Sequence, residues 1–281
     1  MKIAQAVKKF LLYAILIVFT LFVAFPLVYT LLASFKSNQE IMTAGIDIFP
    51  KKFILDNYKE AWVLADFKQY TWNSIYMSVC IVIGVVFTSS TAGYVFARGN
   101  FPGKKLIFGI FTSTMFLALG SITLYPLLQV TKFLHINTSL WGVIIVNVFG
   151  LQITNIFLVR GYVNSIPKEV DEAAKIDGCS FIGIFMKIIA PLLKPIMATV
   201  ALLTFQGAWN DYLLPMVFTL GNPKNAPLVV GIVSLKSTGA AASSWNLMMA
   251  GTMISIIPIL FIYVILNKWF ISGLTSGAVK G

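Results

Sequence analysis

Long, uninterrupted apolar runs constrain this chain more than any other feature of its sequence. A helix needs roughly 20 mostly apolar residues to cross about 30 Å of hydrocarbon. Six segments meet this requirement, at about 11–33, 70–97, 106–129, 140–160, 196–220 and 245–269. Closed β-barrels also satisfy their backbone in lipid, but they alternate over segments of about ten residues, and these runs are continuous. The sequence therefore predicts an all-α membrane protein with six transmembrane helices.

The composition argues against an ordinary soluble domain and against a nucleic-acid ligand. The chain is 58% hydrophobic and 11% charged, whereas soluble domains average about 45–50% and about 25%. A net charge of +11 would suit phosphate neutralisation. The basic residues, however, lie in the loops between apolar runs, with no aromatic surface between them for stacking on bases. We therefore expect the partner of this surface to be the lipid bilayer and not nucleic acid.

The basic residues predict the orientation of the spans. If the chain starts in the cytoplasm, 13 of the 21 lysine and arginine residues fall on the cytoplasmic side, as the positive-inside rule requires. The first run extends from Phe10 to Phe35, which is too long for the apolar core of a signal peptide, about 7–15 residues. We therefore expect both termini in the cytoplasm. The predicted parts are a cytoplasmic N-terminus (1–10), a membrane domain (11–269) and a cytoplasmic C-terminal tail (270–281).

Prolines and small residues within the apolar runs predict how the helices bend and pack. A proline removes a backbone hydrogen bond, so breaks or kinks are expected at Pro26, Pro126, Pro215 and Pro258. Gly84 and the small run 89–93 (SSTAG) allow two helix backbones to approach closely, which we interpret as packing.

The segment 165–195, between the fourth and fifth predicted spans, has clear start and stop residues for two short helices. Pro167 suits the first turn of a helix, and the acids that follow it stabilise the positive end of the helix dipole. Gly178 is the expected residue at the C-terminal end. These positions predict one helix over about 167–177 and a second from Ser180 to Pro191.

The first of these two helices carries a face of small side chains. Val170, Ala173, Ala174 and Asp177 fall at i, i+3, i+4 and i+7. Such a face is shallow and ends in a carboxylate. From the residues alone, the helix is either an amphipathic connector on the membrane surface or a helix that docks into a groove of another protein.

Several residues of this segment resemble the EAA loop of ABC-importer permeases. They are Glu172, Ala173, Ala174, Asp177, Gly178, Phe185, Ile188, Pro191 and Pro195. Ala190 stands where that family usually has leucine. The segment also lies where the family has its loop, on the predicted cytoplasmic side.

The resemblance implies ATPase coupling by Val170, Glu172, Ala173, Ala174, Asp177 and Gly178. In that family the loop docks into a cleft of a separate ATPase. Glu172 would then pair with a basic residue of the ATPase, while Ala173 and Ala174 would permit close contact. The implied partners are a homologous second permease in a heterodimer, two copies of the ABC ATPase and an extracellular solute-binding protein. ATP and Mg would be bound by the ATPase and no cofactor by this chain. The location would be the bacterial cell membrane, with multiple spans.

Two further segments resemble the shorter, six-span permease of maltose-type carbohydrate importers. They are 204–215 (TFQGAWNDYLLP) in the fifth predicted span and 273–281 (GLTSGAVKG) at the C-terminus. This resemblance implies a sugar or oligosaccharide substrate. It also implies a second ATPase contact through the tail, at Ser276, Gly277 and Lys280.

Polar residues inside the predicted spans are candidates for the substrate path. Asp211 is the one carboxylate set within a predicted span, and such residues usually face a bundle interior or a wet cavity. Amides and aromatic rings around it could bind sugar hydroxyls, although amides also join helices to one another. The candidates are Asn147, Gln152, Asn155, Gln206, Trp209, Asn210, Asp211 and Tyr212.

Other functions lack the residues that they would need. Neither a metal site nor a catalytic site is expected, since His135 is the only histidine and has no acid or cysteine near it in the sequence. Nothing resembles a P-loop, so we do not expect ATP hydrolysis by this chain. Two alternatives stay open: an ABC importer for a non-sugar solute such as a peptide or polyamine, and a secondary transporter outside the ABC class.

Overall fold

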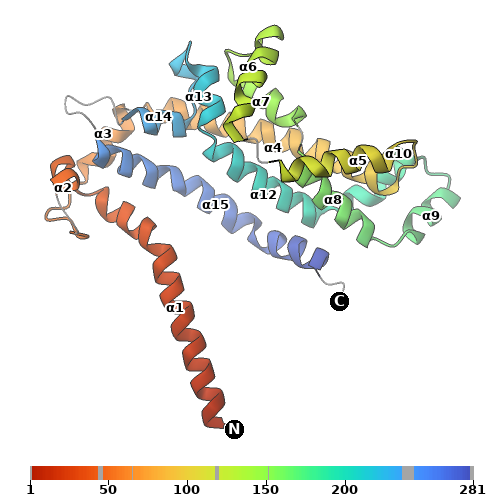
Figure 1. The fold of residues 1–281 in the computed structure, drawn as a ribbon, viewed down its shortest axis with the longest axis horizontal. Coiled ribbons are helices and arrows are strands. Elements are labelled where there is room, and N and C mark those ends of the chain that lie inside the picture. The colour runs from red at the N-terminus through yellow and green to blue at the C-terminus, as the bar shows by residue number, and fades with distance from the viewer. Residues whose placement is uncertain are drawn as a thin grey trace. The chain divides into compact units, whose positions relative to one another are not determined.

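The computed structural model describes residues 2–43, 47–64, 66–117, 120–150, 152–235 and 244–278. Every regular element in these residues is helical and none is a strand, so the predicted all-α class is confirmed. The chain divides into two units. Unit 1 comprises Met1–Lys68 and Gly231–Ile257, and unit 2 comprises Gln69–Val230 and Pro258–Gly281. Figure 1 shows the helices of both units as a ribbon, and the two units are described separately below.

Unit 1 is built from the N-terminal helices and the first half of the last helix. Its elements are α1 (Lys2–Ala33), α2 (Asn38–Thr43), α3 (Asp56–Leu64), the end of α14 (Leu228–Ser234) and the start of α15 (Trp245–Ala278). The apolar side chains of α1 are exposed along its length, up to 78% for Phe22, as expected of a helix that faces lipid or another chain. Pro26 lies inside α1 and Pro258 inside α15, so neither proline breaks its helix.

The buried amide of Asn57 joins three elements of unit 1. Its Nδ2 donates to the carbonyl oxygens of Ser34 and Lys36, both at 2.8 Å, beyond the end of α1. Its Oδ1 accepts from Nδ2 of Asn246 in α15 at 2.8 Å. A buried amide with all these groups paired fixes the relative positions of the elements that it joins.

Unit 2 contains the helices that surround α4 (Phe67–Arg98). These are α5 (Lys104–Ser113), α6 (Leu124–Phe133), α7 (Leu140–Phe149), α8 (Ile153–Ser165), α9 (Glu169–Ile176), α10 (Phe181–Ile184), α11 (Ala190–Leu192), α12 (Lys194–Asn210), α13 (Leu213–Thr219) and the second half of α15. A Cβ added at Gly84 would lie 2.4 Å from Val148, and one at Gly93 would lie 2.6 Å from Val159. Both glycines therefore allow α4 to touch α7 and α8, which confirms the packing interpretation.

Three described helices are long and apolar enough to cross a membrane: Val7–Ala33, Phe67–Arg98 and Trp245–Asn267. They coincide with the first, second and sixth predicted spans. Two bent pairs meet the same criterion together: Leu140–Phe149 with Ile153–Ser165, and Phe181–Leu192 with Lys194–Asn210. The part of the chain that the structure describes thus supplies three candidate spans, or five if each bent pair crosses once.

The third predicted span, 106–129, is not one continuous helix. It divides into α5 and α6, with short 3₁₀ turns at Thr114–Phe116 and Gly120–Thr123. At the end of α5, the hydroxyls of Ser113 and Thr114 donate to the carbonyls of Ile110 and Phe111 at 2.7 and 2.6 Å. Such side-chain bonds compete with the helical ladder and favour a helix end.

The fifth predicted span, 196–220, is also broken. The helix α12 ends at Asn210, Asp211 is extended, and α13 begins at Leu213. Pro215 explains the position of this break, because proline cannot donate to the carbonyl four residues earlier and its ring collides with it. That carbonyl belongs to Asp211, so the expected effect of Pro215 is confirmed.

Candidate functional site

The first short helix of 165–195 is α9, which starts two residues later than expected. Glu169, Asp171 and Glu172 lie in its first turn, where carboxylates stabilise the positive end of the helix dipole. Lys175 lies in its last turn, where a positive charge is favourable. The charges of this segment therefore favour a short helix of fixed length.

Gly178 ends α9 through two backbone hydrogen bonds. Its φ angle is +78°, in the left-handed region that favours glycine. The N–H of Cys179 donates to the carbonyl of Ala174 at 2.9 Å, and the N–H of Gly178 donates to that of Lys175 at 3.0 Å. This pair of bonds is the Schellman arrangement, so the predicted C-terminal stop is confirmed.

The second short helix begins and ends almost where the sequence predicts. The hydroxyl oxygen of Ser180 accepts from the N–H of Gly183 at 3.1 Å and caps α10. A π-helical turn, Phe185–Ile189, then joins α10 to α11. The ring of Tyr94 at the end of α4 packs on Phe181 and Phe185, with centroids 4.6 and 5.0 Å apart. The second helix is thereby held against α4.

A buried ion pair holds α9 to the end of α4. Nε of Arg98 donates to Oδ2 of Asp171 at 2.8 Å, and the two side chains are only 7% and 8% exposed. A second nitrogen of the same guanidinium donates to the carbonyl of Ile166, before α9, at 2.6 Å. The arginine therefore binds both the helix and the chain that leads into it.

This ion pair was not predicted from the sequence. There, Arg98 is one of the basic residues that indicate orientation, and Asp171 is one of the acids that favour the start of a helix. The two residues are 73 positions apart, so no helical spacing relates them. The sequence offered only two indications of this pair: Arg98 is a basic residue at the end of the second predicted span, and Asp171 is an acid in the loop after the fourth.

The structure divides the predicted small face of α9 between the core and the exterior. Ala174 is buried at 4% exposure within the hydrophobic core of unit 2, and Val170 is half-buried. Ala173 and Asp177 are exposed, as is Glu172. The expectation of one continuous docking face is therefore wrong, because Asp171 and Ala174 turn the same side of α9 toward the protein. The exposed face carries Glu172, Ala173 and Ile176, whose side chain is 87% exposed.

The candidate substrate residues near the α7–α8 break form a local amide network. Nδ2 of Asn147 donates to the carbonyl of Val143 at 3.0 Å, within α7. Nε2 of Gln152 donates to the carbonyl of Asn147 at 2.9 Å, and Nδ2 of Asn155 donates to Oε1 of Gln152 at 3.2 Å. Two of these bonds satisfy backbone carbonyls beside the helix break, as polar side chains do inside membranes.

The candidate residues of the fifth predicted span do not all face the same way. Trp209 is buried at 1% exposure and stacks on Phe205, with ring centroids 5.4 Å apart. Gln206 and Asn210 are exposed, while Asp211 and Tyr212 are half-buried beside the α12–α13 break. The indole of Trp209 is therefore part of the packing and not of an open polar patch.

The remaining sequence candidates lie near the C-terminus and after α6. The helix α15 continues to Ala278, so Ser276 and Gly277 belong to its last turns and not to an extended tail; Lys280 lies outside the described residues. His135 adopts a positive φ of 56° in the turn after α6. No group of three histidine, cysteine, aspartate or glutamate side chains that could hold a metal occurs within the described ranges.

Comparison with known proteins places this architecture in a family. The family model described as binding-protein-dependent transport system inner membrane component matches residues 89–276, which include α9 and the ion pair that holds it. The chain belongs to this family. It is thus a permease subunit of an ABC transporter, located in the inner membrane with multiple spans. Such a permease is not itself catalytic and binds no cofactor, because the ATPase is a separate subunit.

Individual relatives extend the likeness over the whole permease. The galactooligosaccharides transport system permease protein GanQ of Bacillus subtilis (strain 168) is 33% identical over 288 residues, covering 100% of this chain and 99% of GanQ. The arabinooligosaccharides transport system permease protein AraQ of the same organism is 32% identical, covering 92% and 90%. A crystal structure of a bacterial ABC transporter involved in alginate import has the same fold, with a TM-score of 0.79 at 23% identity over 95% of this chain and 98% of that one.

Membership in this family implies two kinds of partner for the permease. A binding-protein-dependent transporter needs a solute-binding protein to deliver the substrate and an ATPase to drive its passage. The ATPase and binding-protein partners expected from the sequence are therefore confirmed as classes.

Proposed function

We propose that α9 is the helix through which the ATPase acts on this permease. The supporting observation is that α9 is attached to the rest of the permease on one face and exposed on another. The buried Arg98–Asp171 pair joins it to the end of α4, while Ala173 and Ile176 are exposed away from that contact and Glu172 is exposed beside it. A helix fixed to the body on one face and open on the other transmits a push from a bound protein to the spans. Val170, Ala174, Asp177 and Gly178 then shape the helix, and Glu172 and Ala173 meet the ATPase.

The proposed assembly is a heterodimer of this permease with a homologous second permease, two ATPase copies and an extracellular binding protein. In this assembly both termini and α9 lie in the cytoplasm, and the chain crosses the membrane six times. Ser276 and Gly277, in the last turns of α15, and Lys280, which follows that helix in the sequence, add a second ATPase contact. ATP and Mg are bound by the ATPase subunits. Closure of those subunits moves α9 and changes which side of the membrane the substrate path faces.

We propose a sugar or oligosaccharide as the substrate. The names of GanQ and AraQ, which assign oligosaccharides to those relatives, support this choice. Within the permease, the exposed amides of Gln206 and Asn210 beside half-buried Asp211 and Tyr212 offer hydrogen-bonding groups suited to hydroxyls. The amides near the α7–α8 break already bond to one another or to backbone, at Asn147, Gln152 and Asn155. We therefore assign them to stabilising the break beside the substrate path and not to binding the sugar.

The exposed and buried alanines of α9 provide the test of coupling. In the co-expressed complex, Ala173→Leu enlarges the exposed face without a clash in the core. We expect it to lower the amount of co-purifying ATPase about tenfold while leaving the thermal stability of the permease unchanged. Asn164→Leu, an exposed change on α8, is the matched control and should retain the ATPase. Normal ATPase recovery with Ala173→Leu would refute docking through this face.

The substrate is tested separately with the cognate binding protein. Calorimetric titration with a panel of oligosaccharides, short peptides and polyamines should give binding to a glycan and none to the other two classes. A binding protein that takes peptides and ignores every glycan would overturn the sugar assignment while leaving the coupling role of α9 intact.

A further inference from the structure

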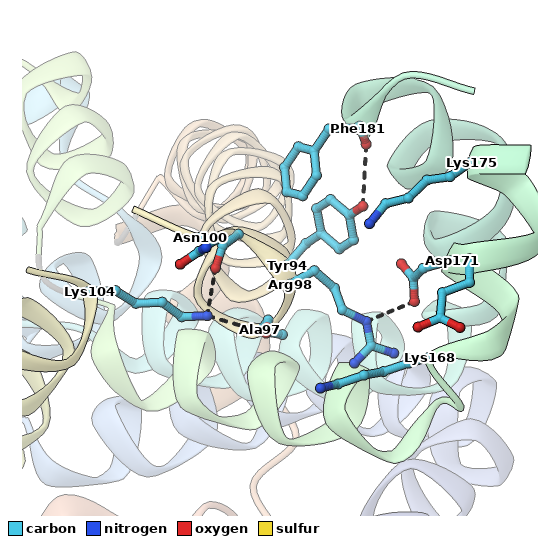
Figure 2. A pocket seen from close by; sticks show the side chains of 11 residues that line it. Tyr94, Ala97, Arg98, Asn100, Lys104, Lys168, Asp171, Lys175 and Phe181 are labelled. Carbon is cyan, nitrogen blue, oxygen red and sulfur yellow. Dashed lines mark hydrogen bonds and ion pairs between the residues drawn. The ribbon is translucent and has the colours of Figure 1, made fainter. Parts of the chain in front are cut away.

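A cavity of about 340 Å³ lies between the end of α4, the start of α5 and one side of α9 (Figure 2). Arg98 and Lys104 contribute to its wall from α4 and α5, and Lys168, Asp171 and Lys175 from α9 and the residue before it. The last three positions are i, i+3 and i+7, so they share one side of the helix. Ala173 and Ile176 do not line the cavity.

The cavity has more positive than negative charge. Four basic and two acidic side chains line it, and the ion pair of Arg98 with Asp171 cancels one of each. Lys104, Lys168 and Lys175 then remain against Glu172 alone. Burial, and next the positive charges of Arg160 and Lys168, lower the pKa of Lys104. Burial is the larger cause, and the other two show that Lys104 lies near the positive charges of Arg160 and Lys168.

The three lysines of the cavity make no ion pair with the residues that the structure describes. Nζ of Lys104 donates to the carbonyls of Ala97 and Gly99, at 3.4 and 2.8 Å. In Figure 2, Lys175 points toward Tyr94 and Lys168 toward the Arg98 guanidinium. Both ammonium groups are therefore directed into the cavity and available to an anion.

We propose that this cavity binds the phosphate group of an anionic phospholipid. Basic pockets between helices at the cytoplasmic side of a membrane protein are suited to such headgroups. Arg98 is the last residue of the candidate span α4, so the cavity lies at one end of a helix that is long and apolar enough to cross the membrane. The bound lipid would neutralise the lysines and hold α9 at a fixed distance from the bilayer. The proposal rests on the proposed topology, which puts this end of α4 at the cytoplasmic side, and does not depend on transport or on ATPase docking.

The test measures lipid binding with charge-matched variants. The purified complex in neutral detergent is titrated with phosphatidylglycerol, and bound lipid is counted by native mass spectrometry. Each lysine near an anionic headgroup contributes about fivefold to binding, so K168Q/K175Q should weaken it about 25-fold. K187Q/K194Q removes the same charge from exposed sites on the same loop outside the cavity and should bind normally. K168R/K175R keeps the charges and should also retain the lipid.

The source of the phosphate and the competing occupant are tested in the same experiment. Inorganic phosphate should not displace the lipid, because it lacks the acyl chains that hold the lipid against the apolar surface of the protein; displacement would assign the cavity to a soluble phosphate and overturn the lipid assignment. Equal weakening in both lysine pairs, or none in either, would also refute the site. If K168Q/K175Q lost the ATPase while still binding phosphatidylglycerol, the lysines would belong to the protein interface instead.

Discussion

At the residue scale, the Arg98–Asp171 pair gives a prediction that depends on burial. The substitution Arg98→Met leaves the Asp171 carboxylate buried without a partner, since both side chains are under a tenth exposed. Breaking such a pair costs about 3–5 kcal/mol. We expect the thermal transition of the purified permease in neutral detergent to fall by at least about 5 °C. Lys105→Met, at an exposed position, should leave it unchanged.

The double variant Arg98→Met/Asp171→Leu separates burial from attraction. Replacing both buried charges with apolar groups is often neutral or stabilising, so the double variant should recover most of the loss. A double variant as unstable as the single one would contradict this account. The pair would then contribute net attraction and not merely avoid an unpaired charge.

This pair also marks the limit of sequence reasoning at the residue scale. Glu172 and Gly178 were identifiable because their roles follow from positions within one short helix. The partner of Asp171 was not, because it lies on another helix and only the packing of α4 against α9 brings it near. The burial of Trp209 was missed for the same reason, since the sequence does not determine which neighbouring helix the indole ring of Trp209 packs against.

At the element scale, the end of α9 gives a prediction about backbone conformation alone. A Cβ at Gly178 would meet no atom within 4 Å, so Gly178→Ala adds no clash. It does, however, force alanine into the left-handed backbone conformation of Gly178, which costs an L-amino acid roughly 1–2 kcal/mol. We expect amide hydrogen exchange across 169–178 to become about five- to thirtyfold faster, because local opening of α9 becomes easier.

The control for this prediction is Gly161→Ala. Gly161 also has open space around it but lies inside α8, without a positive φ. Alanine there should slow local exchange or leave it unchanged, since alanine favours a helix interior. Equal acceleration by both substitutions would show that loss of glycine flexibility, and not the left-handed angle, controls α9.

Elements were predictable where the determining residues are local. Pro167, Gly178 and Ser180 placed both short helices of 165–195 to within two residues. The break in 196–220 was predictable for the same reason, from Pro215. The predicted span 106–129 failed as a continuous helix because hydropathy counts apolar residues and ignores backbone competition. The hydroxyls of Ser113 and Thr114 end a helix without changing hydropathy.

At the scale of the whole molecule, the segment 104–133 determines the topology. Within the described residues, three long helices and two bent pairs give up to five crossings, which would place the two termini on opposite sides. A sixth crossing by α5 and α6 would place them on the same side. Each of these helices has 10 residues, about 15 Å, so together they can span about 30 Å. The polar groups at their break must then be satisfied within the protein.

Cysteine labelling on intact cells distinguishes the two topologies. After Cys80 and Cys179 are replaced by alanine or serine, single cysteines are placed at Asn100 and His135, on either side of 104–133, and at Lys59 and Lys175. We expect a membrane-impermeant maleimide to label the cysteines at 59 and 135 in intact cells, and those at 100 and 175 only after permeabilisation. That result requires 104–133 to cross the membrane, because the label reaches 135 and not 100. Labelling of 100 and 135 from the same side would mean that α5 and α6 return to the side where they began. The chain would then have five spans, and the positions of its termini would no longer follow from the distribution of basic residues.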